Sequence, residues 1–311
     1  MVDTFLLLAL VGSVLRATTP LLLAALGGMF SERSGVVNIA LEGIILFGAL
    51  AAAVVTQLVE APYLTQNPRA VVWFAPWLGV LAAVIAGGLI GWLHALVSIR
   101  YQADQIISGT AINLMGVGIP ALVLMGLYNN STTSTPLVNR LPQWGVGPFS
   151  FSPLVYLAFL LVPVAWYVLF KTPFGLRLRA VGEHPDAAAS VGVGVRRMRY
   201  YGVIISGVLA GLAGAYLSVG HLNQLISEMS GGRGFIALAA LIFGKWHPLG
   251  VLGATLLFGS FEAVATLLGG ARLMPSTIVS GIPFILTMLV LAGFIGRAIP
   301  PKAIGKAYDR A

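Results

Sequence analysis

The sequence predicts an all-α integral membrane protein with about 8–10 transmembrane helices, some of them broken or re-entrant. Of its 311 residues, 58% are hydrophobic and only 9% are charged, and the mean hydropathy is +0.93. This composition is typical of a chain that is solvated largely by lipid. Several apolar runs also reach the roughly 20 residues that a helix needs to cross a bilayer.

Seven long apolar runs are the expected spans. They are residues 4–30, 77–99, 105–128, 151–170, 201–222, 250–268 and 278–296. The first run is too long for a cleavable signal and begins beside Asp3 instead of basic residues, so we expect it to stay as a span. Residues 44–58 form a shorter span, and residues 235–243 are too few to cross alone. Residues 235–243 therefore predict a re-entrant or broken helix. The whole of residues 1–311 is expected to form a single transmembrane domain.

The basic residues predict the orientation of the chain. Ten of the eighteen lie in two short segments, which the positive-inside rule places in the cytoplasm. The first segment holds Lys171, Arg177, Arg179, Arg196, Arg197 and Arg199, and the second holds Arg297, Lys302, Lys306 and Arg310. Because this distribution follows the topology, the net charge of +8 indicates no nucleic-acid surface.

Two short polar segments resemble each other. Ser31 to Gly35 reads SERSG, and Ser227 to Gly231 reads SEMSG. Five expected spans separate the two segments, so the copies have opposite orientations, as inverted-topology repeats require. Glycine-interrupted segments of this kind point to a transport site in membrane proteins.

The longest polar segment, residues 171–200, is expected to be a cytoplasmic loop. Within it, residues 184–191 predict a short helix, because Pro185 stands at its first turn and Asp186 complements its dipole. Gly192 and Gly194 end this helix. Such a helix between two spans could dock a soluble partner, although a plain solvated connection is the alternative.

Ionisable groups inside spans are costly and usually face a bundle interior or a cavity. Arg16, His94 and Glu262 are of this kind, and we expect Arg16 and His94 to be either snorkelling side chains at helix ends or structural hydrogen-bond partners. Asn38 and Glu42 stand four residues apart and would share one face if the segment is helical. Together with Asn113, the polar residue of its span, they are our candidates for the substrate pathway.

Enzyme chemistry finds little support in the sequence. The nearest approach to a phosphate-binding loop, Gly244-Lys245, is followed by Trp246 and has Ala239 where the motif requires glycine. The four histidines are dispersed and cysteine is absent, so no metal site is expected. We therefore expect neither catalytic nor metal-binding residues in this chain.

Four long stretches resemble the permease subunits of bacterial ATP-binding-cassette (ABC) importers, in the branch that includes ribose, branched-chain amino acid and nucleoside permeases. The likeness covers nearly the whole chain and is greatest to the nucleoside or simple-sugar subset. The stretches are GGMFSERSGVVNIALEG (27–43), TPFGLRLRAVGEHPDAAASVGV (172–193), GRGFIALAALIFGKWHPLG (232–250) and LTMLVLAGFIGR (286–297).

The resemblance implies a set of partners in the inner membrane of a bacterium. A separate ATPase subunit would bind ATP and Mg²⁺, so this chain needs no cofactor of its own. A second, homologous permease subunit and a substrate-binding lipoprotein of the basic-membrane-protein type would complete the importer. The loop segment that matches the family's coupling helix carries Gly175, Arg177, Arg179, Gly182, Glu183 and Pro185.

The scarcity of intramembrane charge favours a neutral solute such as a nucleoside, because a branched-chain amino acid needs partners for both an ammonium and a carboxylate group. A branched-chain amino acid or simple-sugar permease is the alternative within the family. From other classes, an ATP-independent secondary transporter or a subunit without a pore remains open.

Overall fold

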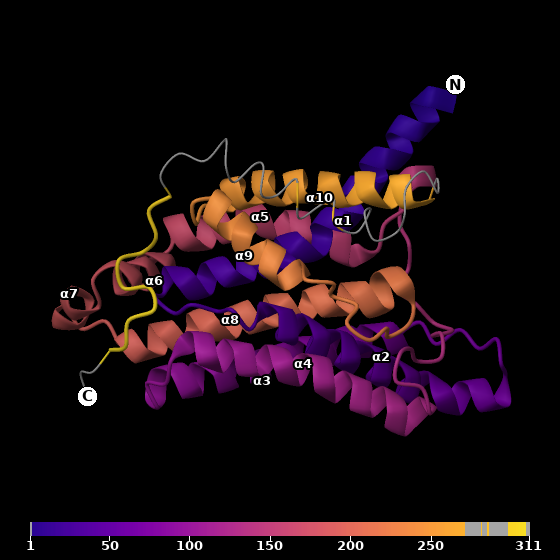
Figure 1. Ribbon diagram of the computed structural model, residues 1–311, viewed down its shortest axis with the longest axis horizontal. Helices are drawn as coiled ribbons and strands as arrows, with labels where there is room; N and C mark the ends of the chain where they lie inside the picture. Colours follow the sequence, from indigo (N-terminus) through magenta and orange to yellow (C-terminus); the bar gives the residue numbers. More distant parts are fainter. Residues whose placement is uncertain (1, 271–280, 282–284, 286–297, 309–311) are drawn as a thin grey trace.

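The computed structural model describes residues 2–270, 281, 285 and 298–308 and shows an elongated bundle of helices (Figure 1). Seven described helices are long and apolar enough to cross a membrane, and α9 is shorter. The long helices are α1 (Val2–Arg33), α2 (Leu41–Gln66), α3 (Ala75–Ala95), α4 (Gln105–Tyr128), α5 (Pro153–Lys171), α8 (Val195–Ala215) and α10 (Pro248–Gly270). The short elements are η1 (Leu96–Arg100), η2 (Gly147–Phe149), α6 (Pro173–Glu183), α7 (Pro185–Ser190), η3 (Tyr216–Leu222) and α9 (Arg233–Phe243).

These helices confirm the expected all-α membrane protein. The expected span at residues 44–58 is too short, because α2 continues to Gln66. Its outer turns are stabilised by Glu60, whose buried carboxylate accepts hydrogen bonds from the backbone N–H groups of Val138 and Asn139 at 3.2 and 2.9 Å. The expected span at 278–296, the stretch 286–297, Arg297 and Arg310 lie outside the described residues, apart from residues 281 and 285.

Helix α8 runs through the centre of the bundle and packs against α1, α2 and α3. Glycine permits this approach, since a Cβ atom on Gly207 would lie 2.2 Å from the carbonyl oxygen of Gly87. A Cβ atom on Gly211 would lie 2.3 Å from the carbonyl oxygen of Ala83. The small residues of α8 therefore serve close helix packing, as their four-residue spacing predicts.

The outward face of α3 is exposed and apolar. Leu81, Ile85 and Leu89 recur every four residues and are 52, 53 and 59% exposed. In an aqueous protein such an apolar stripe would be unfavourable, but in a membrane it is the solvated face.

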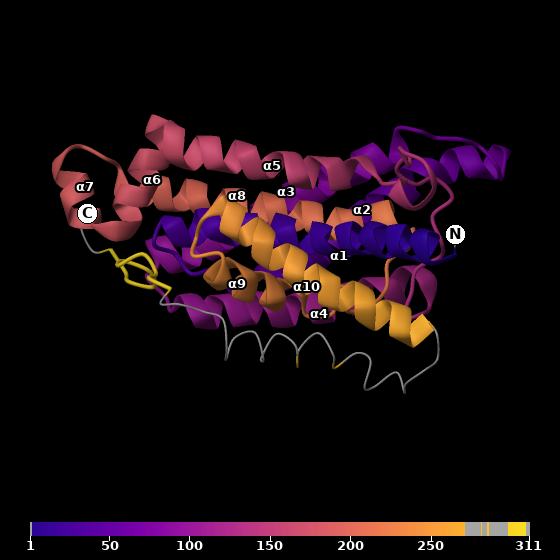
Figure 2. The same ribbon diagram turned by 90° about the horizontal axis from the view of Figure 1, so that it is seen from above.

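Both basic segments lie at the same end of the bundle. Helices α6 and α7 project from this end, and residues 298–308 lie beside them (Figures 1 and 2). The positive-inside rule makes this the cytoplasmic end. Residues 298–308 therefore lie on the cytoplasmic side, as the basic residues of the tail predict.

Candidate functional site

Two interrupted helices enter the bundle from opposite ends. After α1, a turn closes with a 2.9 Å hydrogen bond from Gly35 N–H to the carbonyl of Glu32, and α2 begins only at Leu41. After η3, an equivalent turn closes with a 2.9 Å hydrogen bond from Gly231 N–H to the carbonyl of Glu228, just before α9. The similar SERSG and SEMSG segments thus share the hydrogen bond that closes the turn, which supports the inverted repeat. Their backbones differ, because Glu32 is helical and Glu228 has a φ of 54°.

The two interrupted helices meet at Glu42. Its carboxylate accepts hydrogen bonds from the Ser230 hydroxyl at 2.5 Å and from the N–H groups of Gly232 and Gly234 at 2.8 and 2.6 Å. Glu42 is only 7% exposed. Because the N-terminus of α9 carries a partial positive charge, a carboxylate is the favoured partner there. Glu42 therefore anchors the start of α9 to the start of α2.

Asn113 and Asn38 complete this junction. Asn113 accepts a 2.8 Å hydrogen bond from Gly43 N–H and donates one of 2.9 Å to the carbonyl of Ile39. Asn38 donates a 2.8 Å hydrogen bond to the hydroxyl of Ser206 on α8. The structure therefore brings the three predicted pathway residues into one buried group.

Asn38 and Glu42 do not share a helix face, because the segment is not helical at Asn38, which precedes α2. Its side chain instead accepts a 3.1 Å hydrogen bond from Ala40 N–H and shapes the turn into the helix. His94 behaves as the sequence suggests: its ring nitrogens lie 3.0 Å from the Ser108 hydroxyl and 3.0 Å from the carbonyl of Val37.

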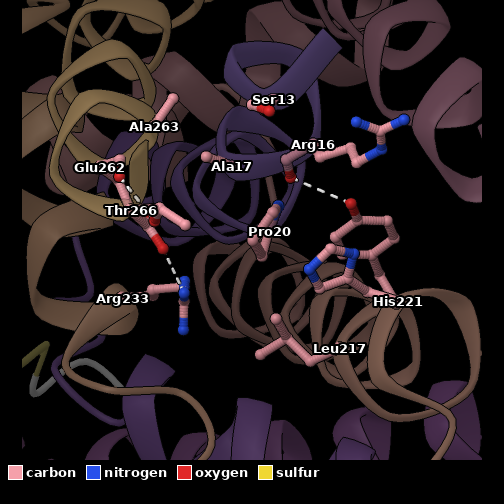
Figure 3. Close-up of a pocket in the computed structure, with 11 residues that line it drawn as sticks. Ser13, Arg16, Ala17, Pro20, Leu217, His221, Arg233, Glu262, Ala263 and Thr266 are labelled. Atoms are coloured by element: carbon pink, nitrogen blue, oxygen red, sulfur yellow. Dashed lines mark hydrogen bonds and ion pairs between the residues drawn. The ribbon is translucent and has the colours of Figure 1, made fainter. Parts of the chain in front are cut away.

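An outer cavity of about 330 Å³ lies between α1, η3, α9 and α10 (Figure 3). An ion pair between Arg233 and Glu262 crosses it, and the ring of His221 stacks on Tyr216 at a centroid distance of 5.8 Å. Its lining is Ser13, Arg16, Ala17, Pro20, Tyr216, Leu217, His221, Arg233, Glu262, Ala263 and Thr266. None of the predicted pathway residues lines this cavity.

Sequence reasoning recognised Arg16 and Glu262 as intramembrane charges but did not place them at one cavity. Arg233 was not among the predicted site residues, although a basic residue at the start of a short apolar segment could have indicated it. Arg16 does have the structural role expected of it, donating hydrogen bonds to the carbonyls of Pro148 and Ser150 at 2.9 and 3.3 Å.

The segment predicted to couple to an ATPase forms two helices at the cytoplasmic end, α6 and α7. The predicted short helix is α7, which begins at Pro185, and α6 before it was not predicted. Gly175 lies against α5, where a Cβ atom would be 2.2 Å from the carbonyl oxygen of Val168. The guanidinium carbon of Arg179 lies over the ring of Phe170, 4.6 Å from the ring centroid. Arg177 is exposed.

Helix α6 ends directly on the turn after α1, with Glu183, half-buried, as its last residue. A Cβ atom on Gly182 would lie 2.2 Å from the carbonyl oxygen of Arg33. Arg33 in turn donates hydrogen bonds of 3.0 and 2.8 Å to the carbonyl of Trp246, whose indole N–H donates to Glu32. The coupling segment, the turn and the α9–α10 connection therefore form one contact group.

The C-terminal tail, residues 298–308, straps this group together. Ala303 N–H donates to the carbonyl of Gly182 at 2.9 Å, and Gly305 N–H donates to the carbonyl of Gly35 at 3.1 Å. Arg199 of α8, only 2% exposed, donates a 2.8 Å hydrogen bond to the carbonyl of Lys306. The tail thus bridges three elements that are distant in sequence.

Comparison with known proteins finds matches along nearly the whole chain. Residues 10–291 match the family described as the permease component of the branched-chain amino acid transport system. The guanosine ABC transporter permease protein NupQ of Bacillus subtilis is 45% identical, over 96% of this chain and 96% of its own. The nucleoside ABC transporter permease protein NupC of Lactococcus lactis is 38% identical, also over 96% of both chains.

A further similar protein comes from the first of these organisms. The guanosine ABC transporter permease protein NupP of Bacillus subtilis is 26% identical, over 94% of this chain and 84% of its own. No solved structure matches the chain.

Proposed function

Because the chain belongs to the family of permease components of the branched-chain amino acid transport system, we propose that it imports nucleosides as the membrane-spanning subunit of an ABC transporter. The observation that carries the solute assignment is the full-length similarity to two permease proteins named for guanosine and nucleosides, at 45 and 38% identity. The chain is a multi-pass cell-membrane protein, and its family works with an ABC ATPase.

The ATPase subunit would dock on α6 and α7. Arg177 is exposed there, and the predicted coupling residues Gly175, Arg179, Gly182, Glu183 and Pro185 all lie in or beside these two helices. ATP and Mg²⁺ would be bound by the ATPase, and this chain would contribute the docking surface alone.

A second, different permease subunit would complete the pore. In its favour, two guanosine permease proteins of one organism, NupQ and NupP, both resemble this chain. A substrate-binding lipoprotein would deliver the solute at the outer end, so that the permease itself needs only a weak site.

Motion would pass from the ATPase to the pathway through backbone contacts. Gly182 touches Arg33 at the turn after α1, and that turn leads through Asn38 to the junction at Glu42. Closure of two ATPase domains on ATP would move α6 and α7, shift the turn and rock the interrupted helices between inward-open and outward-open states.

The test is purification of the tagged chain from its native membrane under mild conditions, followed by mass spectrometry and uptake assays in liposomes. Co-purification of an ATPase and a second permease, with ATP-dependent uptake of radiolabelled guanosine, supports the proposal. ATP-dependent uptake of a sugar or a branched-chain amino acid instead would reassign the solute. Uptake by the isolated chain without ATP would favour a secondary transporter.

A further inference from the structure

The outer cavity has the size and position of a compartment for a small solute. Its volume of about 330 Å³ falls at the lower end of the range, about 300–1,000 Å³, that is typical of ligand pockets. Glu262 stands fourteen residues into α10, which begins at the cytoplasmic end, so at 1.5 Å per residue it lies about 21 Å from that end. The cavity therefore occupies the outer half of the bundle.

A second cavity of about 160 Å³ adjoins the first, since both are lined by Arg16, Tyr216 and His221. It continues to Arg140 and Gln143 in the loop between α4 and α5. The two cavities form a polar route from the outer loop to the ion pair. Polar groups along a route at membrane depth are the usual mark of a path for a solute.

Hydrogen-bond donors outnumber acceptors in the outer cavity. Arg233 donates through Nη1 to the carbonyls of Met229 and Ser230, each at 3.1 Å, and its Nε is buried away from the cavity surface. Its Nη2 pairs with Glu262, and only this one bond is described for the two N–H groups of Nη2. The two hydrogen bonds described for the Arg16 guanidinium both come from Nη2. A guanidinium group has five N–H donors. These arginines can therefore serve acceptor atoms on a ligand.

An aromatic wall stands beside these donors. The His221 ring stacks on Tyr216 with an interplanar angle of 17°, and in Figure 3 the His221 ring lies between Arg16 and Leu217. His221 is exposed while Tyr216 is buried, so His221 offers the free face. A flat heterocycle can stack there with its edge toward the arginines.

The geometry points to the outer cavity as the compartment that holds a nucleoside in transit, with the base on His221, its acceptor edge on Arg16, and the sugar hydroxyls near the paired Arg233 and Glu262. This inference rests on the proposed function. Bases with adjacent carbonyl and ring-nitrogen acceptors suit a guanidinium fork, and vicinal hydroxyls suit a carboxylate acceptor.

Cysteine labelling tests the cavity directly, because the chain contains no cysteine and so gives no background. Ser13→Cys and Thr266→Cys place a thiol on the cavity lining, whereas Ser260→Cys places one on α10 away from it. The complete transporter carrying each variant would be treated from outside with a charged, membrane-impermeant methanethiosulfonate reagent. The labelling rate is measured with and without guanosine and its binding protein. Guanosine uptake is measured before and after labelling.

We expect both lining variants to react, to lose uptake on labelling and to react several-fold more slowly when guanosine is being delivered. The Ser260→Cys variant is expected to react slowly and keep its uptake. Lining thiols that fail to react in a transporter with normal uptake would overturn the cavity assignment alone. Absence of nucleoside uptake in the unlabelled wild-type transporter would overturn the proposed function as well.

A second measurement separates recognition from scaffolding. If the ion pair only holds α9 to α10, the exchange Arg233→Glu with Glu262→Arg should restore uptake lost in each single variant. We expect no restoration, with a loss of roughly 10-fold to 100-fold, the effect of a lost charge-assisted hydrogen bond. Should the exchanged protein not assemble, Glu262→Gln is measured instead, and unchanged uptake in that variant would contradict the assignment.

Discussion

The N–H group of Gly234 donates a 2.6 Å hydrogen bond to the carboxylate of Glu42 across 192 positions of the chain. This bond joins the first turn of α2 to the first turn of α9, two helices that enter the bundle from opposite ends. Only glycine fits at position 234, because a Cβ atom there would lie 2.4 Å from the backbone nitrogen of Glu42. The backbones of α2 and α9 therefore approach each other closely at this point.

Glu42→Gln is expected to lower both stability and uptake. An amide group turns its NH₂ toward one of the donors on Ser230, Gly232 or Gly234, and an unsatisfied buried donor costs about 1–3 kcal/mol. Thermal unfolding in detergent and uptake in liposomes measure the two effects. Glu60→Gln is the matched control, because Glu60 also accepts three hydrogen bonds but lies outside the junction. Full uptake by Glu42→Gln would show that the junction is not part of the pathway.

Gly207→Ala is expected to destabilise the bundle. Its methyl group would meet the carbonyl oxygen of Gly87 at 2.2 Å, and forcing α8 away from α3 costs about 1–3 kcal/mol. Gly118→Ala is the control, since nothing lies within 4 Å of the added atom. The apparent melting temperature of the purified variants measures the effect, and equal melting temperatures would contradict the packing described for α8.

Arg177→Glu is expected to release the ATPase. The exposed guanidinium of α6 would become a carboxylate on the proposed docking surface, so co-purification of the ATPase should fall several-fold while the permease stays folded. The same substitution at Arg69, which is exposed on the loop before α3, is the control at the opposite end. Retention of the ATPase by both variants would show that α6 is not part of the interface.

Removal of residues 299–311 is expected to uncouple ATP hydrolysis from uptake. The carbonyls of Gly182 and Gly35 would lose their partners, and the buried Arg199 would lose its hydrogen bond to Lys306. We expect ATPase activity to persist with reduced uptake per ATP hydrolysed. Removal of residues 309–311 alone is the control, and unchanged coupling in the longer deletion would exclude a role for the tail.

Much of the fold follows from the sequence because lipid leaves few choices. A long apolar run has to satisfy its backbone internally, so the positions of α3, α4 and α5 could be predicted from hydropathy. The extension of α2 to Gln66 could not, because it depends on Glu60 reaching Val138 and Asn139 from a loop distant in sequence. Helix α6 was not predicted, because its polar residues are equally typical of a loop.

The candidate site was predicted in its residue types more than in its geometry. Glu42 stood out as a rare intramembrane acid, but its partners on α9 are backbone N–H groups, which have no sequence signature. Arg16 and Glu262 were visible as isolated charges. Their meeting at one cavity with Arg233 depends on how α1, α9 and α10 pack, and pairwise proximity across the chain cannot be read from one sequence.

The strap of residues 298–308 also has a consequence for biosynthesis. The ribosome makes these residues long after Gly35 and Gly182, so the carbonyls that accept hydrogen bonds from Ala303 and Gly305 stay unpaired until this segment has been made. Until then the turn after α1 has no strap across it. A chain that stalls before this segment therefore presents an unfinished cytoplasmic face, by which membrane quality control could distinguish it from a subunit that carries the strap.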